Sequence, residues 1–514
     1  MELLDKLLDY YHLSKDEYEH MSRPLNEVHL IDPNSIKGMD KVVSRIRSAI
    51  SHSEKIIIYG DYDCDGISAT SIMVRTFQML NYPVSYYIPS RYKDGYGLNV
   101  ENVIKIAASG FKLIIAVDNG ISANEAIDKA NELGVDVIVV DHHELPNEPV
   151  KAVGVIHPLV SEISSIIGSG GYMSLFVSGA LLGHYDDYLV TLAGLSTISD
   201  LMELKEYNRD VVRLALDAFR KHRYLPLSLL LDNNVINEKA FSLSIAPKIN
   251  AVGRLSEDSS TNRLVKYLTS ENEKEIYALS EWILSLNEKR KELTKEAVET
   301  LPELKDEAGI CLLTDMKEGL IGLVANRLMN EYNLPTIVFT NDGDKSILKG
   351  SIRSKEGFNV TKAFESLNKY LLTGGGHALA GGLSIKAEDF DSFKKDFLEL
   401  CKKYTIQEEK IETIDISLSD VNQATYKILE SFSPFGMGFK EPVFLIKDLP
   451  TRALTFISQG KHLSTKLSIS TKLLGFNMSE GEIKAKPYIS IYGTFAISEY
   501  KGFESLEFRI SKYE

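Results

Sequence analysis

The chain has 514 residues, enough for more than two domains at the ~150 residues that a domain usually takes. Hydrophobic residues make up 44% and charged residues 25%, as in a soluble globular protein rather than a disordered or membrane protein. The formal net charge of −14 argues against non-specific coating of nucleic acid, although an acidic protein can still carry a local basic groove.

The N-terminus and the cysteines bear on the cellular compartment. No apolar stretch approaches the ~18 residues that span a bilayer. Residues 1–6, Met-Glu-Leu-Leu-Asp-Lys, lack the basic start and apolar core of a signal peptide. Three cysteines, at positions 64, 311 and 401, are too widely spaced for a disulfide framework or a zinc site. We therefore expect a cytoplasmic protein, with Cys64 filling a small buried slot.

Strands and helices alternate in the pattern of the chain from residue 55 to about residue 157. The expected strands are 55–59, 84–88, 112–117 and 135–140. The expected helices are 67–80, 101–108 and 123–133. The strands are apolar and rich in β-branched residues, which is typical of a parallel sheet covered by helices on both faces. Such sheets bind ligands at the carboxyl ends of their strands.

Carboxylates and histidines follow three of these strands. Aspartates 61, 63 and 65 follow the first, Asp118 follows the third, and Asp141-His142-His143 follows the fourth. One Asp at a junction between a strand and a helix is usually a helix cap, but three junctions that all carry Asp or His are hard to explain as caps. Like charges this close repel, so a buried cluster needs a cation, and hard oxygen ligands suit Mg²⁺ or Mn²⁺. The pattern predicts a divalent metal site.

The remaining chain divides into further parts. Residues 272–301 carry apolar side chains at spacings of three and four, which predicts one long amphipathic helix. We interpret it as a domain connector rather than a partner-binding coiled coil, because Arg290 interrupts the apolar seam. A second α/β unit follows, and short alternating runs beyond residue 411 predict a small β-barrel. The expected domain boundaries are 1–215, 216–304, 305–405 and 411–514.

Several short motifs occur in order from about residue 56 to the C-terminal region. They are Asp61-Tyr-Asp-Cys-Asp-Gly, Asp118-Asn-Gly, Asp141-His-His, Pro247-Lys-Ile-Asn-Ala-Val-Gly-Arg254, Gly350-Ser-Ile-Arg-Ser354, Gly374-Gly-Gly-His-Ala-Leu-Ala-Gly-Gly382 and Pro434-Phe-Gly-Met-Gly. The Asp-His-His triplet alone is a weak signal, whereas the ordered set is highly specific. The set resembles the RecJ single-strand DNA exonucleases of the DHH phosphoesterase superfamily.

The resemblance implies a fold and an activity. The fold would be α/β: a parallel-sheet lobe and a smaller α/β lobe joined by a long helix, followed by an oligonucleotide-binding (OB) barrel. The activity would be 5′-to-3′ hydrolysis of single-stranded DNA with two Mn²⁺ or Mg²⁺ ions, in DNA repair and recombination or in phage DNA metabolism. Single-stranded DNA would be the substrate, with a single-strand-binding protein or a helicase as protein partner and no membrane.

The resemblance also assigns roles to residues. Asp118 would bridge both ions, and one ion would be completed by Asp65, His142 and Asp200. The other ion would be held by Asp61 and Asp63. The catalytic group would be Asp118, Asp141 and His143, with His143 donating to a phosphate oxygen. Without the resemblance, Asp200 reads as a helix cap.

Substrate phosphates need guanidinium groups and backbone amides, and the matched motifs supply both. The glycine run before His377 could wrap a phosphate or make a tight turn, and we favour phosphate binding. In the expected barrel, Lys461, His462, Lys466 and Phe456 would hold the strand, although a solvated basic edge explains the lysines almost as well. The expected substrate-binding residues are Arg91, Asn250, Arg254, Ser351, Arg353, Gly375, Gly376 and His377.

The chain departs from the family pattern at three places. Met316-Lys317 stands where a Trp-His pair is usual, His157 replaces an asparagine before Pro158, and Phe439 replaces the asparagine after Gly438. None of these changes removes an expected metal ligand.

Two other functions remain open on the sequence. The first is a DHH phosphoesterase for short RNA or cyclic dinucleotides, which typically lacks a barrel, so residues 411–514 argue against it. The second is an inactive single-strand-binding scaffold of the same fold, against which the retained aspartates and histidine argue.

Overall fold

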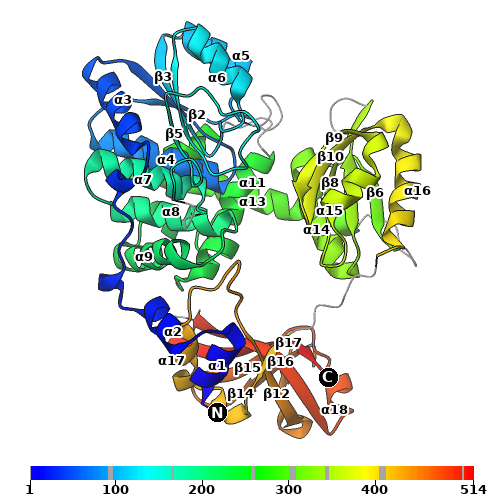
Figure 1. Ribbon diagram of the computed structural model, residues 1–514. Helices are drawn as coiled ribbons and strands as arrows, with labels where there is room; N and C mark the ends of the chain where they lie inside the picture. Colours follow the sequence, from blue (N-terminus) through cyan, green and yellow to red (C-terminus); the bar gives the residue numbers. More distant parts are fainter. Residues whose placement is uncertain are drawn as a thin grey trace.

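The computed structural model describes residues 2–90, 97–163, 167–255, 261–299, 308–341, 346–404, 412–500 and 503–514. Figure 1 shows a first lobe drawn from dark blue to green, a second lobe in yellow-green, and a C-terminal domain in orange and red. The helix α13 (Glu273–Glu299) runs from the first lobe to the second. The predicted α/β fold with two lobes and a C-terminal β domain is confirmed.

The first lobe is built on a sheet of five parallel strands in the order β2-β1-β3-β4-β5. The strands are β1 (Lys55–Tyr59), β2 (Ser85–Tyr87), β3 (Phe111–Val117), β4 (Asp136–Val140) and β5 (Gly154–Ile156). Successive residues point to opposite faces. Ile56 and Ile58 therefore pack in one apolar cluster while Ile57 and Tyr59 pack in another.

Helices cover both faces of this sheet. The face that carries Ile56 lies against α3 (Met39–Ser51), α4 (Cys64–Met79) and α7 (Gly170–Leu182), and the other face lies against α5 (Val100–Ala108) and α6 (Asn124–Glu132). Val117 pairs with Val140 at the ends of β3 and β4, so the residues that follow, Asp118 and Asp141, are neighbours. The fold thus brings the predicted acidic strand ends to one edge.

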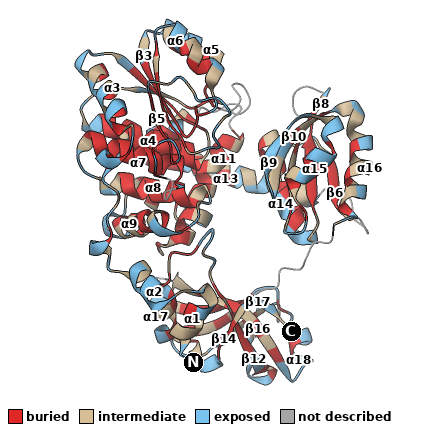
Figure 2. Ribbon diagram, in the orientation of Figure 1, coloured by how far each residue is buried: buried red, intermediate tan, exposed pale blue. Residues whose placement is uncertain are grey.

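A helical layer extends the first lobe. Its members are α8 (Asp187–Ser199), α9 (Glu206–His222), α10 (Leu225–Ser228), the π-helical turn η3 (Ala240–Ile245), α11 (Ala246–Leu255) and α12 (Asn262–Thr269). Helices α4, α7 and α8 are buried along most of their length (Figure 2). A helix that is apolar all round belongs in a core, which explains why α7 and α8 show no polar stripe.

The second lobe holds a five-stranded mixed sheet in the order β6-β7-β8-β10-β9. Its strands are β6 (Ile310–Thr314), β7 (Thr336–Thr340), β8 (Ile347–Arg353), β9 (Leu371–His377) and β10 (Ala380–Lys386), and its helices are α14 (Glu318–Tyr332), α15 (Val360–Ser366) and α16 (Phe390–Cys401). The glycine run expected as a loop lies in the exposed edge strand β9, paired on one side with β10. Its backbone is therefore extended rather than folded into an amide nest.

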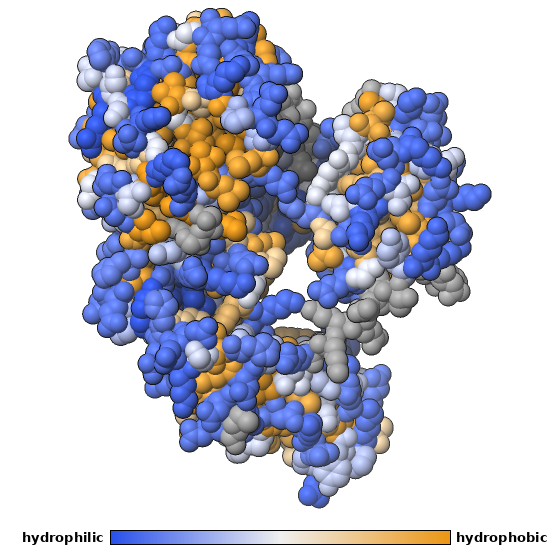
Figure 3. Space-filling model, viewed as in Figure 1, coloured by the Kyte–Doolittle hydropathy of each residue, from blue (hydrophilic) through white to orange (hydrophobic). Residues whose placement is uncertain are grey.

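The C-terminal domain is a seven-stranded mixed sheet in the order β11-β12-β16-β17-β15-β14-β13. Its elements are β11 (Thr413–Asp415), α17 (Gln423–Glu430), β12 (Val443–Pro450), β13 (Phe456–Ile457), β14 (His462–Lys466), β15 (Thr471–Gly475), α18 (Glu480–Lys484), β16 (Tyr488–Tyr500) and β17 (Phe503–Tyr513). In the space-filling view an open gap separates this domain from the second lobe (Figure 3).

Two N-terminal helices pack on the C-terminal domain. They are α1 (Leu3–Tyr11) and α2 (Lys15–Ser22), drawn in dark blue beside the orange strands in Figure 1. Leu7 and Leu8 are buried in the same apolar cluster as Phe444 and Phe495. Residues 3–22, assigned to the first domain from the sequence, thus share a core with the last domain. Within the described part of the chain, no helix has the length and apolar character needed to cross a bilayer.

Candidate metal centre and substrate groups

The loop after β1 places three carboxylates around the start of α4. Asp63 is the N-cap of α4, and its Oδ1 accepts hydrogen bonds from Asp65 N at 2.9 Å and Gly66 N at 3.0 Å. A Cβ atom at Gly66 would lie 2.6 Å from Asp61 Cβ, so only glycine lets the two backbones approach this closely. The tight turn packs Asp61, Asp63 and Asp65 into one small volume.

Asp65 is the most firmly held of these carboxylates. Its oxygens accept hydrogen bonds from Gly170 N and Gly171 N, both at 2.8 Å, and from the Ser196 hydroxyl. Both amides belong to the first turn of α7, where the helix dipole favours negative charge. The side chain is 2% exposed. These contacts fix the orientation of Asp65 before any cation binds.

His142 joins the separate strand ends. Its Nε2 lies 3.1 Å from Asp118 Oδ1 and 3.5 Å from both Asp65 Oδ2 and Asp200 Oδ2. Asp200 caps the C-terminal end of α8, which brings a carboxylate from the helical layer to the sheet edge. Burial is the largest influence on the pKa of His142 and lowers it, so the imidazole stays neutral and can act as a metal ligand.

The carboxylates and histidines form three overlapping groups, and within each group one carboxylate oxygen or ring nitrogen per residue lies within 4.8 Å of the others. The groups are Asp61, Asp63 and Asp118; Asp65, His142 and Asp200; and Asp118, Asp141, His142 and His143. Burial, and then the nearby charges of Asp65 and Asp63, raise the pKa of Asp118 well above its usual value. The same influences raise the pKa of Asp200 to about 8. A cluster whose members repel one another in this way fits one or two divalent cations.

His143 and Asp141 form a separate pair. Burial alone would lower the pKa of His143, but the hydrogen bond and charge of Asp141, 2.7 Å away, raise the pKa to about 9. Burial would likewise raise the pKa of Asp141, but His143 and the Ile121 amide outweigh it and hold the pKa at about 2. The pair is an imidazolium and a carboxylate, and the imidazolium is 44% exposed and can donate a proton or hydrogen bond.

His157, which stands where the family pattern has asparagine, supports this pair through the backbone. Its Nδ1 accepts a hydrogen bond from Leu159 N at 3.2 Å, so its Nε2 carries the proton and donates to His143 O at 2.8 Å. The substitution therefore keeps a side chain that orients the Asp141-His142-His143 loop.

The predicted substrate groups lie in both lobes. Asn250 Oδ1 accepts from Cys64 N at 2.8 Å, so this side chain also fixes the first turn of α4. Arg254 NH1 donates to Gly319 O at 3.2 Å and thereby ties α11 to the start of α14 in the second lobe. Arg91 lies outside the described residues.

Arg353 and Ser351 lie together on β8. Arg353 NH1 donates to Ser351 Oγ at 3.0 Å and to Ile352 O at 2.7 Å. An added Cβ at Gly322 would lie 3.0 Å from Arg353 NH2, so α14 passes close over this guanidinium. His377 ends the exposed strand β9, where Gly375 has no heavy atom within 4 Å of an added Cβ. These groups present donors at the surface of the second lobe, apart from the buried carboxylates.

Comparison with known proteins identifies the family of this chain. Family models match residues 55–208 (DHH family, N-terminal domain), 308–403 (DHHA1 domain) and 414–512 (RecJ OB domain). The single-stranded-DNA-specific exonuclease RecJ of Escherichia coli is 31% identical over 454 residues, which cover 80% of this chain and 78% of that protein. The chain belongs to the RecJ family. The family predicted from the ordered motifs is thereby confirmed.

The chain is also similar to other RecJ proteins in sequence and in structure. RecJ of Bacillus subtilis is 34% identical over 494 residues, and the match spans 91% of this chain and 62% of that relative. The crystal structure of Thermus thermophilus RecJ in complex with Mn²⁺ superposes with a TM-score of 0.85 at 23% identity and covers 100% of this chain and 76% of that one. A crystal structure of exonuclease RecJ bound to manganese is 27% identical with a TM-score of 0.62, covering 72% of this chain and 96% of that one.

Several residues that contact the candidate site residues were not predicted from the sequence. Gly170, Gly171 and Ser196 hold Asp65, and their only sequence signal is a run of small residues in segments that read as core helices. In the C-terminal domain, Phe476 lies in the turn after β15, is 62% exposed and lies edge-on to His462 with ring centroids 5.6 Å apart. A single aromatic in a short loop carries no periodic signal, so pattern reasoning passes over it.

Proposed function

We propose that this chain is a metal-dependent exonuclease that hydrolyses single-stranded DNA from the 5′ end. The observation that carries the proposal is the meeting of three strand ends and one helix end in a buried cluster of carboxylates around His142. Membership in the RecJ family, whose curated members are named single-stranded-DNA-specific exonucleases, supports single-stranded DNA as the substrate, and the 5′ polarity is what the resemblance of the motifs implies.

The cluster suits two divalent ions. Asp61 and Asp63 would hold one ion, the group of Asp65, His142 and Asp200 would hold the other, and Asp118 would bridge them. Two such ions would supply a water of lowered pKa and a positive clamp on the phosphodiester. This assignment explains why so many carboxylates are buried together, since a bound cation would offset the burial and repulsion that raise the pKa of Asp118 and Asp200. Mn²⁺ and Mg²⁺ both occur in RecJ crystal structures.

The chain's own groups would do the remaining work. His143, held as an imidazolium by Asp141, would donate to a non-bridging phosphate oxygen as negative charge develops. Ser351 and Arg353 on β8 would bind a phosphate of the strand, because the guanidinium is already oriented by two hydrogen bonds. Arg254, Asn250 and the exposed edge of β9 with His377 would line the path between the lobes.

An end-labelling experiment tests the proposal. The purified chain with Mn²⁺ or Mg²⁺ should shorten single-stranded DNA from its 5′ end, leave blunt duplex intact and lose activity in excess EDTA. Preferential turnover of dinucleotides or cyclic dinucleotides over long strands would favour the small-substrate alternative. Tight strand binding without cleavage would favour the inactive scaffold. A single-strand-binding protein or helicase as partner stays a prediction.

A further inference from the structure

The turn that follows Asp200 contacts the C-terminal domain through Leu204, which is buried, while Leu201 stays exposed. Residues 201–205 connect α8 to α9, and Leu204 N donates to Met437 O at 2.9 Å across the domain boundary. A Cβ at Gly436 would lie 2.7 Å from Leu204 Cδ1, and one at Gly438 would lie 3.2 Å from Glu203 Cγ. The glycines of this loop thus bring the backbone of one domain directly onto the turn of the other.

Arg209 fixes the same loop from the first turn of α9. Its NH1 donates to Pro434 O at 2.9 Å, and its NH2 donates to Phe432 O at 2.6 Å and Ser433 O at 2.7 Å. Its guanidinium also lies over the Phe439 ring, 4.9 Å from the centroid. Arg209 is 3% exposed. A planar fork that reaches three carbonyls has no equivalent in lysine.

The N-terminal helices hold the loop from its other side. Tyr11 stacks on Phe439 with centroids 4.2 Å apart, and Tyr18 stacks on Phe432 at 4.8 Å. The side chain of Asn208 meanwhile donates to Glu203 O at 3.1 Å and Ile167 O at 2.9 Å. Residues 201–209 of the first lobe and 432–439 of the C-terminal domain therefore form one interface. Hydrogen bonds and ring contacts hold both the turn and the loop there.

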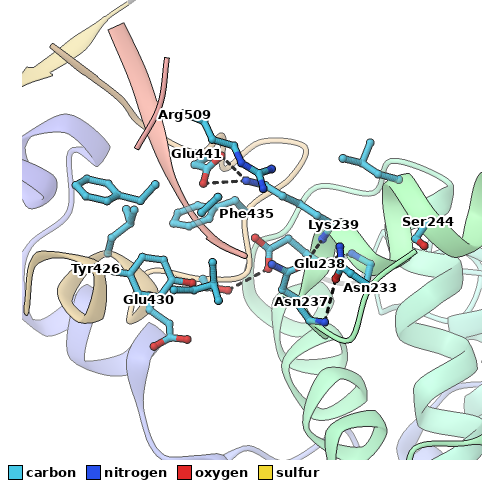
Figure 4. A pocket seen from close by; sticks show the side chains of 18 of the residues that line it. Asn233, Asn237, Glu238, Lys239, Ser244, Tyr426, Glu430, Phe435, Glu441 and Arg509 are labelled. Atoms are coloured by element: carbon cyan, nitrogen blue, oxygen red, sulfur yellow. Dashed lines mark hydrogen bonds and ion pairs between the residues drawn. The ribbon is translucent and has the colours of Figure 1, made fainter. Parts of the chain in front are cut away.

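A polar seam secures the domain at a second point (Figure 4). Ser433 Oγ donates to the buried carboxylate of Glu238 at 3.1 Å, and Lys239 pairs with Glu441 at 2.8 Å. These groups line a cavity of about 190 Å³ between η3 and the C-terminal sheet. Ser433 is therefore held both at its carbonyl, by Arg209, and at its hydroxyl, by Glu238.

Asp200 is held differently from the other carboxylate of its group. Asp65 receives hydrogen bonds from two amides and a hydroxyl. Within the described residues, the closest polar contact of the Asp200 carboxylate is His142 Nε2 at 3.5 Å, and the side chain is 31% exposed. Its backbone lies between the end of α8 and Leu201, which adopts a left-handed φ of 55°. The position of Asp200 thus depends on the turn rather than on its own hydrogen bonds.

We propose that Arg209 and the loop at residues 434–439 are positioning elements for Asp200, so that the C-terminal domain sets the affinity of one of the two metal sites. This inference rests on the proposed two-ion site. It assigns the domain a role in metal binding in addition to any contact with the strand. Residues that orient a metal ligand change metal affinity by roughly 10- to 100-fold when they are substituted.

Calorimetric titration of Mn²⁺ into the full-length, metal-free chain tests the inference. Gly436→Ala pushes against Leu204, and Arg209→Lys removes the fork while keeping the charge. Either change should lower the Mn²⁺ affinity of one of the two sites about ten-fold and leave the affinity of the other site unchanged. Gly481→Ala is the matched control, because its Cβ would meet nothing closer than Ser479 Oγ at 3.9 Å. It should bind both ions as the unsubstituted chain does.

A second variant and a second readout separate positioning from general damage. Leu204→Ala placed in the Gly436→Ala chain makes room for the new methyl group and should restore part of the lost affinity. Hydrogen exchange of the metal-free chain should show faster exchange confined to residues 200–205. Unchanged Mn²⁺ affinity together with faster hydrogen exchange of residues 200–205 would overturn the inference. An equal loss of Mn²⁺ affinity at both sites would also overturn it. A parent chain that binds no Mn²⁺ would instead contradict the proposed function.

Discussion

The two lobes hold their functional groups in opposite ways. In the first lobe, carboxylates of several elements are buried together, and Asp65 and Asp63 are already fixed by backbone amides. In the second lobe, Arg353 is half-buried on a strand and the glycine edge of β9 is exposed. A buried charged cluster is costly without its cation, whereas an exposed donor is not. Under the proposed function, the first lobe would carry out the chemistry and the second would hold the strand.

The largest effect should come from the shared carboxylate of the first lobe. Asp118→Asn should lower kcat by on the order of 10³-fold or more, because a bridging ligand supports both ions and several kcal/mol of transition-state stabilisation. The metal-free variant should unfold at the same or a higher temperature than the parent, since an amide never carries the charge that burial disfavours at Asp118. Single-turnover cleavage and thermal unfolding measure these effects. Asp128→Asn, which alters only a surface pair with Lys151, is the control.

The second lobe should give a smaller effect of a different kind. Arg353→Ala should raise KM about 10- to 100-fold with little change in kcat, since a charge-assisted contact to phosphate contributes ~1.5–3 kcal/mol. Initial rates on 5′-phosphorylated and 5′-hydroxyl strands provide the measurement. Lys355→Ala, which removes a nearby cation bonded to Asn333, should leave both constants unchanged. A full wild-type preference for the phosphorylated end in Arg353→Ala would assign end recognition elsewhere.

The pH dependence of stability sharpens the contrast between the lobes. The raised pKa of Asp118, Asp63 and Asp200, the last at about 8, means that the folded metal-free chain binds more protons than the unfolded chain. Its stability should fall as pH rises through about 4 to 8, and loss of the His143 proton at a pKa of about 9 continues the fall.

The melting temperature of the metal-free chain, measured against pH, tests this expectation. Saturating Mn²⁺ should remove most of the slope, because a bound cation favours the charged carboxylates. The lowered pKa of Asp141, about 2, acts only in strong acid. A metal-free chain that becomes more stable between neutral pH and about 8 would contradict the assigned cluster.

The smallest structural disturbance should come from Gly375→Ala. An added methyl group there meets no heavy atom within 4 Å, so the melting temperature should stay within about 2 °C of the parent. A weaker KM for long strands would then report direct approach of the strand to β9. Gly376→Ala is the contrasting variant, because its Cβ would lie 2.4 Å from Ala380 O and its φ is +149°. It should destabilise the lobe.

Local sequence patterns predicted most of the strands of the first lobe. Apolar strands and the acids that follow them predicted the sheet edge, and β1, β3 and β4 lie within one residue of the expected ranges. Asp200 could be assigned only by resemblance, because α8 is apolar all round and its last residue looks like an ordinary cap. Contacts made across long separations in the chain leave no such pattern.

The N-terminal helices show the same limit. Tyr11 and Phe439 are far apart in sequence, and nothing local in residues 3–22 indicates that they pack against the last domain. The conformation of the glycine run before His377 could not be predicted for a related reason. Glycine permits a loop and an edge strand equally well, and pairing with β10 decides the conformation, while phosphate binding by this run stays a prediction.

The most direct test of the central claim is the number of ions that the cluster binds. Calorimetry of Mn²⁺ binding to the metal-free chain at about pH 8, where the cluster carboxylates can ionise, should give two ions per chain. Asp118→Asn should lower the Mn²⁺ affinity of both sites. A stoichiometry of one, or two ions whose affinities are unaffected by Asp118→Asn, would contradict the assignment of Asp118 as the residue that bridges the two sites.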